Sequence, residues 1–100
     1  MEVSINKDGK KTLVKIVGRL DTTNVADFEK EIAPMMIDPE GDMELDCSEL
    51  DYISSSGLRI FLKLQKCMPE AGGKLVLSNM KSEIKEVFDM TGFTSIFTIE

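Results

Sequence analysis

The chain has 100 residues, of which 42% are hydrophobic and 30% are charged, and its formal net charge is −6 at pH 7. This length predicts one domain with a hydrophobic core, and the negative charge argues against nucleic acid or an anionic membrane as a partner, since both bind cationic surfaces. The sequence shows no secretory signal and no run of about 18 apolar residues, so we expect a cytoplasmic protein.

The absence of histidine excludes several classes of catalytic site. Ser-His-Asp and Cys-His nucleophile systems, imidazole general bases and histidine metal sites all need that residue. Cys47 and Cys67 are expected to be buried thiols and not disulfide partners, since disulfides are typical of secreted proteins.

The N-terminal part of the chain predicts a β-hairpin followed by a helix. Residues 1–6 alternate as a short strand, Asp8-Gly9 favours a tight turn, and the β-branched, apolar residues 12–18 should pair back on the first strand. Helical spacing then appears at Val25, Phe28, Ile32 and Met35.

The ends of this first helix carry their own signals. Thr22 or Thr23 is expected to cap its start, because a hydroxyl there can accept from a free N–H group. Pro34 should kink or stop the helix, since proline cannot donate a backbone hydrogen bond. Residues 38–42 predict a loop.

The rest of the chain alternates between strand and helix. A strand at 43–48 should turn Met43, Leu45 and Cys47 inward, and a mostly buried helix at 58–68 should expose one basic stripe formed by Arg59, Lys63 and Lys66. A strand at 74–78 and a helix from about 81 to 91 follow, with Gly92 at the helix end, and 94–99 predicts a last strand or an extended tail.

The order β-β-α-β-α-β-α-β predicts an α/β fold. We expect a mixed, mostly parallel sheet of four to five strands with three main helices packed on it, because strands that alternate with helices pair in parallel. Residues 1–100 should form this one domain.

Three consecutive serines, Ser54, Ser55 and Ser56, stand between an expected strand and the helix that follows. One interpretation is structural: one serine caps the helix and the others are small loop residues. The other is functional, since the free N–H groups and partial positive charge of a helix N-terminus suit a phosphate, either on a ligand or on a serine.

Other candidate sites are weak. Ser82 to Lys85 spells S-x-x-K, which occurs by chance in helices, and no phosphate-loop or dinucleotide motif is present. Asp46, Glu49 and Asp51 lack calcium-loop spacing and are interpreted as solvated charges, with Asp46 facing away from Cys47. We expect no cofactor and no metal.

Three segments resemble the STAS domain, and most closely the free-standing bacterial anti-sigma factor antagonists. They are GRLDTTNVADFEKEI (18–32), MELDCSELDYISSSGLRIFLKL (43–64) and GGKLVLSNMKSEIKEVFDMTGF (72–93). The most specific pieces are LDYISSSGL (50–58) and FDMTG (88–92), and the resemblance covers nearly the whole chain in the right order.

The resemblance implies a regulator that switches partners and is not an enzyme. In that family the unmodified antagonist binds an anti-sigma factor that is also a serine kinase, and so releases a sigma factor. Phosphorylation then separates the two proteins, and the resemblance implies a serine phosphatase as a further partner. The modified residue lies two positions before the motif glycine, which corresponds to Ser55.

The neighbouring residues of the motif would belong to the same interface. Ser56 and Gly57 share the turn with Ser55, and Ser54 stands where several antagonists have aspartate. Because the carboxyl ends of parallel strands gather at one edge, we expect Asp21, Thr22 and Thr23 to lie beside Ser55 and Arg59 to contribute from the next helical turn.

Two other functions stay open. A STAS scaffold could sense a purine nucleotide at the Ser55 helix end. It could also serve as the STAS subunit of a lipid transporter or of a larger signalling assembly.

Overall fold

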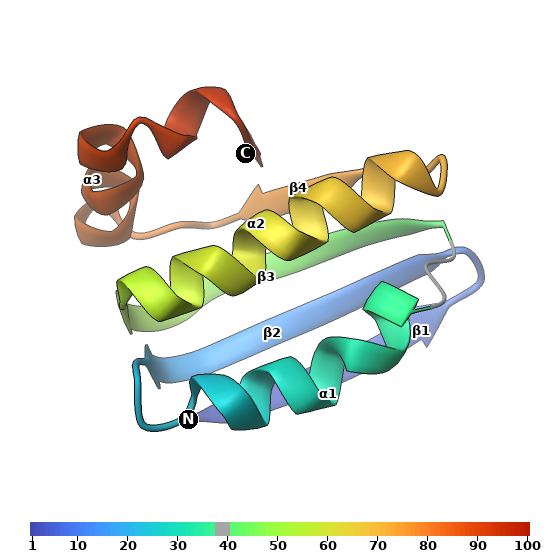
Figure 1. The fold of residues 1–100 in the computed structure, drawn as a ribbon, viewed down its shortest axis with the longest axis horizontal. Helices are drawn as coiled ribbons and strands as arrows, with labels where there is room; N and C mark the ends of the chain where they lie inside the picture. Colours follow the sequence, from blue (N-terminus) through green and yellow to red (C-terminus); the bar gives the residue numbers. More distant parts are fainter. Residues whose placement is uncertain (38–40) are drawn as a thin grey trace.

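The protein forms a five-stranded sheet whose spatial order follows the chain (Figure 1). In this computed structural model residues 1–37 and 41–100 are described. The strands are β1 (Glu2–Asp8), β2 (Lys11–Leu20), β3 (Asp42–Ile53), β4 (Leu75–Ser78) and β5 (Thr98–Ile99). β1 pairs with β2 in antiparallel fashion, and all other neighbours are parallel. The expected mixed, mostly parallel sheet is confirmed.

Three helices connect the parallel strands. They are α1 (Val25–Ile37), α2 (Ser55–Glu70) and α3 (Ser82–Thr91). Each connection moves one strand further in the same direction, and crossovers between parallel strands are right-handed, so successive crossovers lie on the same face of the sheet. Figure 1 shows α1 and α2 lying over that face.

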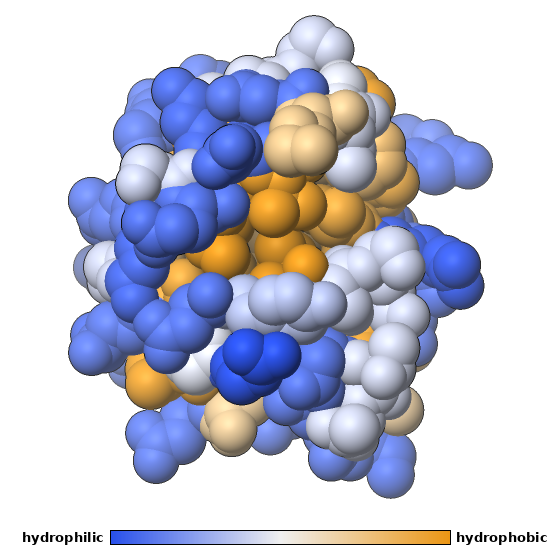
Figure 2. Space-filling view, turned by 90° about the vertical axis from the view of Figure 1, so that its left-hand side faces the viewer, coloured by the Kyte–Doolittle hydropathy of each residue, from blue (hydrophilic) through white to orange (hydrophobic). Residues whose placement is uncertain are grey.

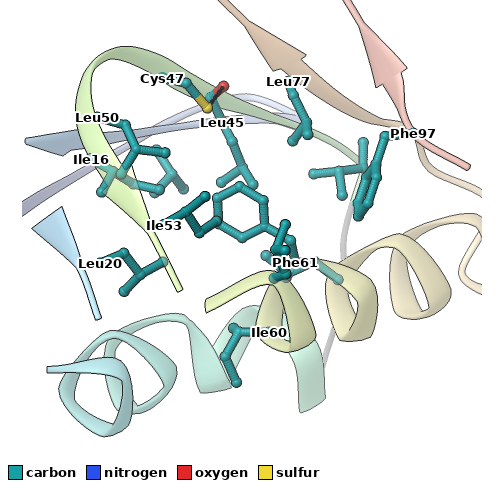
Figure 3. Packing of buried hydrophobic residues seen from close by; sticks show 14 of the residues in the cluster. Ile16, Leu20, Leu45, Cys47, Leu50, Ile53, Ile60, Phe61, Leu77 and Phe97 are labelled. Carbon is teal, nitrogen blue, oxygen red and sulfur yellow. Dashed lines mark hydrogen bonds between the residues drawn. The ribbon is translucent and has the colours of Figure 1, made fainter. Parts of the chain in front are cut away.

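Aromatic rings join the helices to one another within the core. The ring centroids of Phe28 and Phe61 lie 6.2 Å apart, as do those of Phe61 and Phe88, and Phe97 follows at 5.5 Å from Phe88. The strands face these rings with aliphatic side chains, several of which point toward α2 in Figure 3. Burial of this apolar surface is the main stabilising contribution, and tilted rings at these distances add to it.

β3 runs to Ile53, beyond the strand expected at 43–48. Two bulges break the alternation of its side chains, so the pattern in the sequence does not show the second half of the strand. Lys15 pairs with Asp46 but Val17 pairs with Glu49, so β3 carries one extra residue there. A second extra residue follows before Tyr52. Each bulge shifts the phase of the inward side by one residue, and the buried residues are therefore Met43, Leu45, Cys47, Leu50 and Ile53.

Other boundaries also differ from expectation. Pro34 does not stop α1, which runs on to Ile37. α2 begins at Ser55 and not at 58, because the serines themselves form its first turn. Near the C-terminus, residues 93–95 form a 3-10 turn, and only Thr98–Ile99 of the expected strand at 94–99 pairs with β4.

Two turn glycines take the positive φ that the sequence predicts. Gly9 has φ 61° in the hairpin turn, and Gly92 ends α3 with φ 78°. The expected loop at 38–42 is described only at its end, since residues 38–40 lie outside the described residues, and Asp42 already belongs to β3.

Both cysteines are free thiols. Cys47 is buried as expected, whereas Cys67 on α2 is only half-buried. None of the helices in the described ranges is long and apolar enough to cross a membrane.

Candidate functional site

The serines and the start of the α1 connection leave the sheet side by side. Leu20 is the partner of Ile53 at the ends of β2 and β3, and the Ser54 N–H donates to the Leu20 carbonyl at 2.9 Å. Asp21 therefore follows one strand where Ser54 follows the other. The expectation that both segments share one edge of the sheet is confirmed.

This edge is the face of the molecule shown in Figure 2. An apolar hollow occupies its centre, and hydrophilic side chains border it on the left and below in this view. A surface with an apolar centre and a polar rim is typical of protein–protein interfaces.

Ser54 is the N-cap of α2. Its backbone is extended, its Oγ accepts from the Gly57 N–H at 3.2 Å, and its carbonyl accepts from the Leu58 N–H at 2.9 Å. The residue is 8% exposed. The capping role that the sequence left open among three serines therefore belongs to the first of them.

Ser55 is the first residue of α2 and is exposed. Within the described part of the chain its hydroxyl has no hydrogen-bond partner, whereas Ser56 is half-buried. The N–H groups of Ser55 and Ser56 precede the first intrahelical donor and have no acceptor inside α2. An anion on Ser55 would thus meet free donors and the positive end of the helix dipole.

Gly57 allows this helix to begin so close to the sheet. A Cβ added there would lie 2.9 Å from Ile53 Cγ1 and 3.0 Å from two carbons of Leu20. Any larger residue would push the first turn of α2 away from the strand ends. The glycine of the motif therefore allows close packing, which fixes the position of Ser55 relative to the ends of β2 and β3.

Asp21 organises the loop before α1, and the predicted cap at Thr22 or Thr23 is wrong. Asp21 Oδ1 accepts from the Thr23 N–H at 3.0 Å and from the Thr23 hydroxyl at 2.5 Å. The hydroxyl thus donates to a carboxylate and does not accept from the helix. This bond is the first cause that lowers the pKa of Asp21, and the Thr23 N–H adds to it. Thr22 and Thr23 are exposed on the same edge.

Asn24 completes the loop and was missed from the sequence. Its Oδ1 accepts from the Asp21 N–H at 2.9 Å, and its Nδ2 donates to the Arg19 carbonyl at 2.7 Å. Asparagine in a turn often bonds to nearby backbone groups, so its place directly before the apolar periodicity was the available signal.

Arg19 and Tyr52 were also missed. They are partners across β2 and β3, and the guanidinium carbon lies 4.3 Å from the centroid of the Tyr52 ring. Arg19 Nε is 3.8 Å from Asp21 Oδ2. A cation therefore stands at the end of β2, next to the residues that the sequence predicted for the interface.

The basic stripe on α2 is exposed as expected. Arg59 lies one turn after Ser55, and no carboxylate in the described ranges comes within ion-pair distance of it. Lys63 instead pairs with Glu29 of α1 at 2.6 Å. Arg59 is thus the cation of this stripe that stands nearest to Ser55 along the helix.

The acidic residues of β3 have separate cationic or polar partners. Glu49 pairs with Lys15 at 3.0 Å, Asp51 pairs with Lys81, and Asp46 accepts from the Ser48 N–H at 3.0 Å. Among the described residues no group of three or more acidic or cysteine side chains is placed to hold a metal ion. These carboxylates therefore have different neighbours and do not converge on one point.

Comparisons with known proteins agree with this architecture. BtrV of Bordetella bronchiseptica, a candidate anti-sigma factor antagonist, is 34% identical over 99 residues, which cover 99% of this chain and 85% of BtrV. The anti-sigma-B factor antagonist of Bacillus subtilis is 24% identical over 99 residues, covering 99% of this chain and 90% of that protein.

Solved structures share the fold. A candidate anti-sigma factor antagonist from Thermotoga maritima superposes with a TM-score of 0.88 at 17% identity, covering 97% of this chain and 84% of that one. SpoIIAA from Bacillus, an anti-sigma factor antagonist, has been solved unphosphorylated and phosphorylated. The TM-score is 0.77 for both forms, at 15% and 16% identity, with 99% of this chain covered in each and 87% and 91% of SpoIIAA.

The model of the STAS domain family matches residues 2–100. With the sheet order, the capped serine turn and the relatives in agreement, the chain belongs to the STAS domain family.

Proposed function

We propose that this protein is an anti-sigma factor antagonist whose binding to an anti-sigma factor with serine kinase activity is ended by phosphorylation of Ser55. The observation that carries the proposal is that Ser54 and Ser55 have different roles at the start of α2. Ser54 is committed to the helix cap, while Ser55 is exposed and its hydroxyl has no hydrogen-bond partner among residues 1–37 and 41–100. The names of the relatives support the antagonist role.

The docking surface would centre on the shared edge of β2 and β3. Asp21, Thr22 and Thr23 contribute from one side, and Ser56, Gly57 and Arg59 contribute from the first turns of α2. The apolar hollow of Figure 2 offers the desolvated centre that such a surface needs. A cytoplasmic location follows from the proposed partner, since sigma factors act on RNA polymerase.

Phosphorylation would act on the partner and leave the fold of this protein unchanged. A phosphate adds about −1.5 to −2 charges at neutral pH, and at the start of a helix it meets free N–H donors. The equal TM-scores to the two forms of SpoIIAA are consistent with a fold that tolerates this charge. Repulsion or lost contact of about 1.4 kcal/mol reduces the affinity tenfold.

The site is tested with an anti-sigma factor kinase from the same genome and ATP, followed by mapping of the phosphate. We expect phosphate on Ser55, none on the Ser55→Ala protein, and continued modification of the Ser56→Ala control. Phosphate on Ser54 or Ser56 with Ser55 unmodified would contradict the assignment. A serine phosphatase should restore the unmodified protein.

The switch is tested by measuring binding and melting on the same samples. Ser55→Ala should bind the kinase permanently, whereas Ser55→Asp and the phosphoprotein should bind poorly and remain folded. Backbone amide shifts should change around residues 53–60 only. Shifts spread across the whole sheet would mean that the switch is conformational.

A further inference from the structure

Arg19 and Tyr52 form an exposed pair in which the cation lies over the aromatic ring. Their side chains precede Leu20 and Ile53, which are buried, so the alternation of the strands turns the pair away from the core. The Arg19 side chain is 63% exposed and Tyr52 is 41% exposed. The guanidinium at 4.3 Å from the ring centroid is within the range of a cation–π interaction.

The second bulge of β3 determines which residue faces Arg19. Gly18 pairs with Leu50, and the extra residue Asp51 is skipped, so that Arg19 pairs with Tyr52. With regular pairing Asp51 would stand opposite Arg19 and could neutralise it. Asp51 instead forms an ion pair with Lys81. The bulge thus gives Arg19 an aromatic neighbour in place of an acidic one.

The guanidinium keeps donors available for another molecule. Its nearest carboxylate, Asp21 Oδ2, lies 3.8 Å from Nε, which is longer than a hydrogen bond. In the described part of the chain neither terminal nitrogen of Arg19 has a hydrogen-bond acceptor. The contact with the Tyr52 ring restricts the Arg19 side chain, so less rotamer entropy remains to be lost when a ligand binds.

We propose that the Arg19–Tyr52 pair is an anchor of the docking surface and binds a carboxylate side chain of the anti-sigma factor. The inference rests on the proposed function and names the chemistry of that partner. A planar guanidinium with free donors fits a carboxylate in bidentate fashion. Arginine and tyrosine are also among the residues that are enriched where a few side chains dominate the binding energy of an interface.

The surrounding charge makes this anchor selective. The chain as a whole carries a net charge of −6, and the adjacent loop presents Asp21. A carboxylate of the partner would therefore meet repulsion except where it can reach a cation. Arg19 and Arg59 are both exposed on this docking surface, and the position of Arg19 at the end of β2 helps to set the register of docking and to discriminate among related partners.

The experiment measures binding of the kinase-type anti-sigma factor from the same genome to unphosphorylated protein. We compare Arg19→Ala, Arg19→Lys, Tyr52→Ala and Tyr52→Phe with a matched control, Lys15→Ala, which removes an exposed cation earlier on the same strand. Melting curves verify that each variant is folded.

We expect Arg19→Ala and Tyr52→Ala each to weaken binding about tenfold or more. Tyr52→Phe should retain most of the affinity because the ring remains. Arg19→Lys should bind about as weakly as Arg19→Ala, because lysine lacks the planar fork. The double alanine variant should lose little more than either single one, since the two side chains act as a unit. Lys15→Ala should bind like the wild type.

The outcomes separate this proposal from the one on which it rests. Wild-type protein that binds no anti-sigma factor would overturn the proposed function and the anchor with it. Wild-type protein that binds, with Arg19→Ala within twofold of its affinity, would overturn the anchor alone.

Discussion

Alanine substitution at Ser54 should lower the stability of the protein and leave its phosphorylation intact, whereas substitution at Ser55 should abolish phosphorylation and leave the stability intact. Ser54 Oγ accepts from the Gly57 N–H at 3.2 Å, and both residues are buried. Ser55 is exposed, and its hydroxyl bonds to no group in the described ranges. The first hydroxyl therefore stabilises the helix, and the second is available to a kinase.

The magnitudes follow from these contacts. Loss of an N-cap hydroxyl costs about 1 kcal/mol, within a range of about 0.5 to 2, and removal of a bond from a buried N–H group favours the upper part of that range. For a domain of this size, 1 kcal/mol lowers the melting midpoint by about 4–8 °C. Ser55→Ala should change the free energy of unfolding by no more than about 0.5 kcal/mol, as is usual for exposed positions.

Urea unfolding, calorimetry and phosphate mapping on the same three proteins test this contrast. Ser54→Ala should melt earlier than the wild type and still accept phosphate on residue 55, whereas Ser55→Ala should melt normally and accept none. Equal loss of stability in both variants, or no loss in Ser54→Ala, would refute the assignment of the cap to Ser54.

Three further predictions concern packing, pH and thiol reactivity. Gly57→Ala should lower the free energy of unfolding by about 1–3 kcal/mol, because its Cβ would lie 2.9 Å from the nearest side-chain carbon; a urea midpoint equal to that of the wild type would contradict the close packing. The pKa of Asp21 is lowered, chiefly by the bond from the Thr23 hydroxyl. The contribution of the Asp21 carboxylate to stability should therefore be present above the ordinary carboxyl pKa of 3.8 and vanish as the pH falls through the lower folded value. In urea unfolding at several pH values, the difference in free energy of unfolding between wild type and Asp21→Asn should shrink as the pH falls. Burial raises the pKa of Cys47 to about 12, and therefore iodoacetamide at pH 8 should label Cys67 first, as mass spectrometry of the folded protein would report.

Much of the fold and part of the site followed from the sequence alone. The hairpin, the three helices and the parallel order are local consequences of turn residues and of periodicities of 2 and 3.6. The three serines between an expected strand and an expected helix predicted a helix N-terminus close to them, although the helix was expected to begin only at 58, whereas α2 begins at Ser55. The shared edge with Asp21 needed only the rule that parallel strands end on the same side.

The tertiary structure alone decided the features that depend on contacts between distant segments. The two bulges of β3 are set by its pairing with β2, and the sequence pattern of residues 42–53 does not predict them. The same pairing puts Tyr52, and not Asp51, opposite Arg19. The cap role fell to Ser54 because its N–H bonds to Leu20, a residue of another strand, which fixes where the chain turns into α2. Local patterns thus determine which elements form, whereas register between strands determines which side chains meet at their ends.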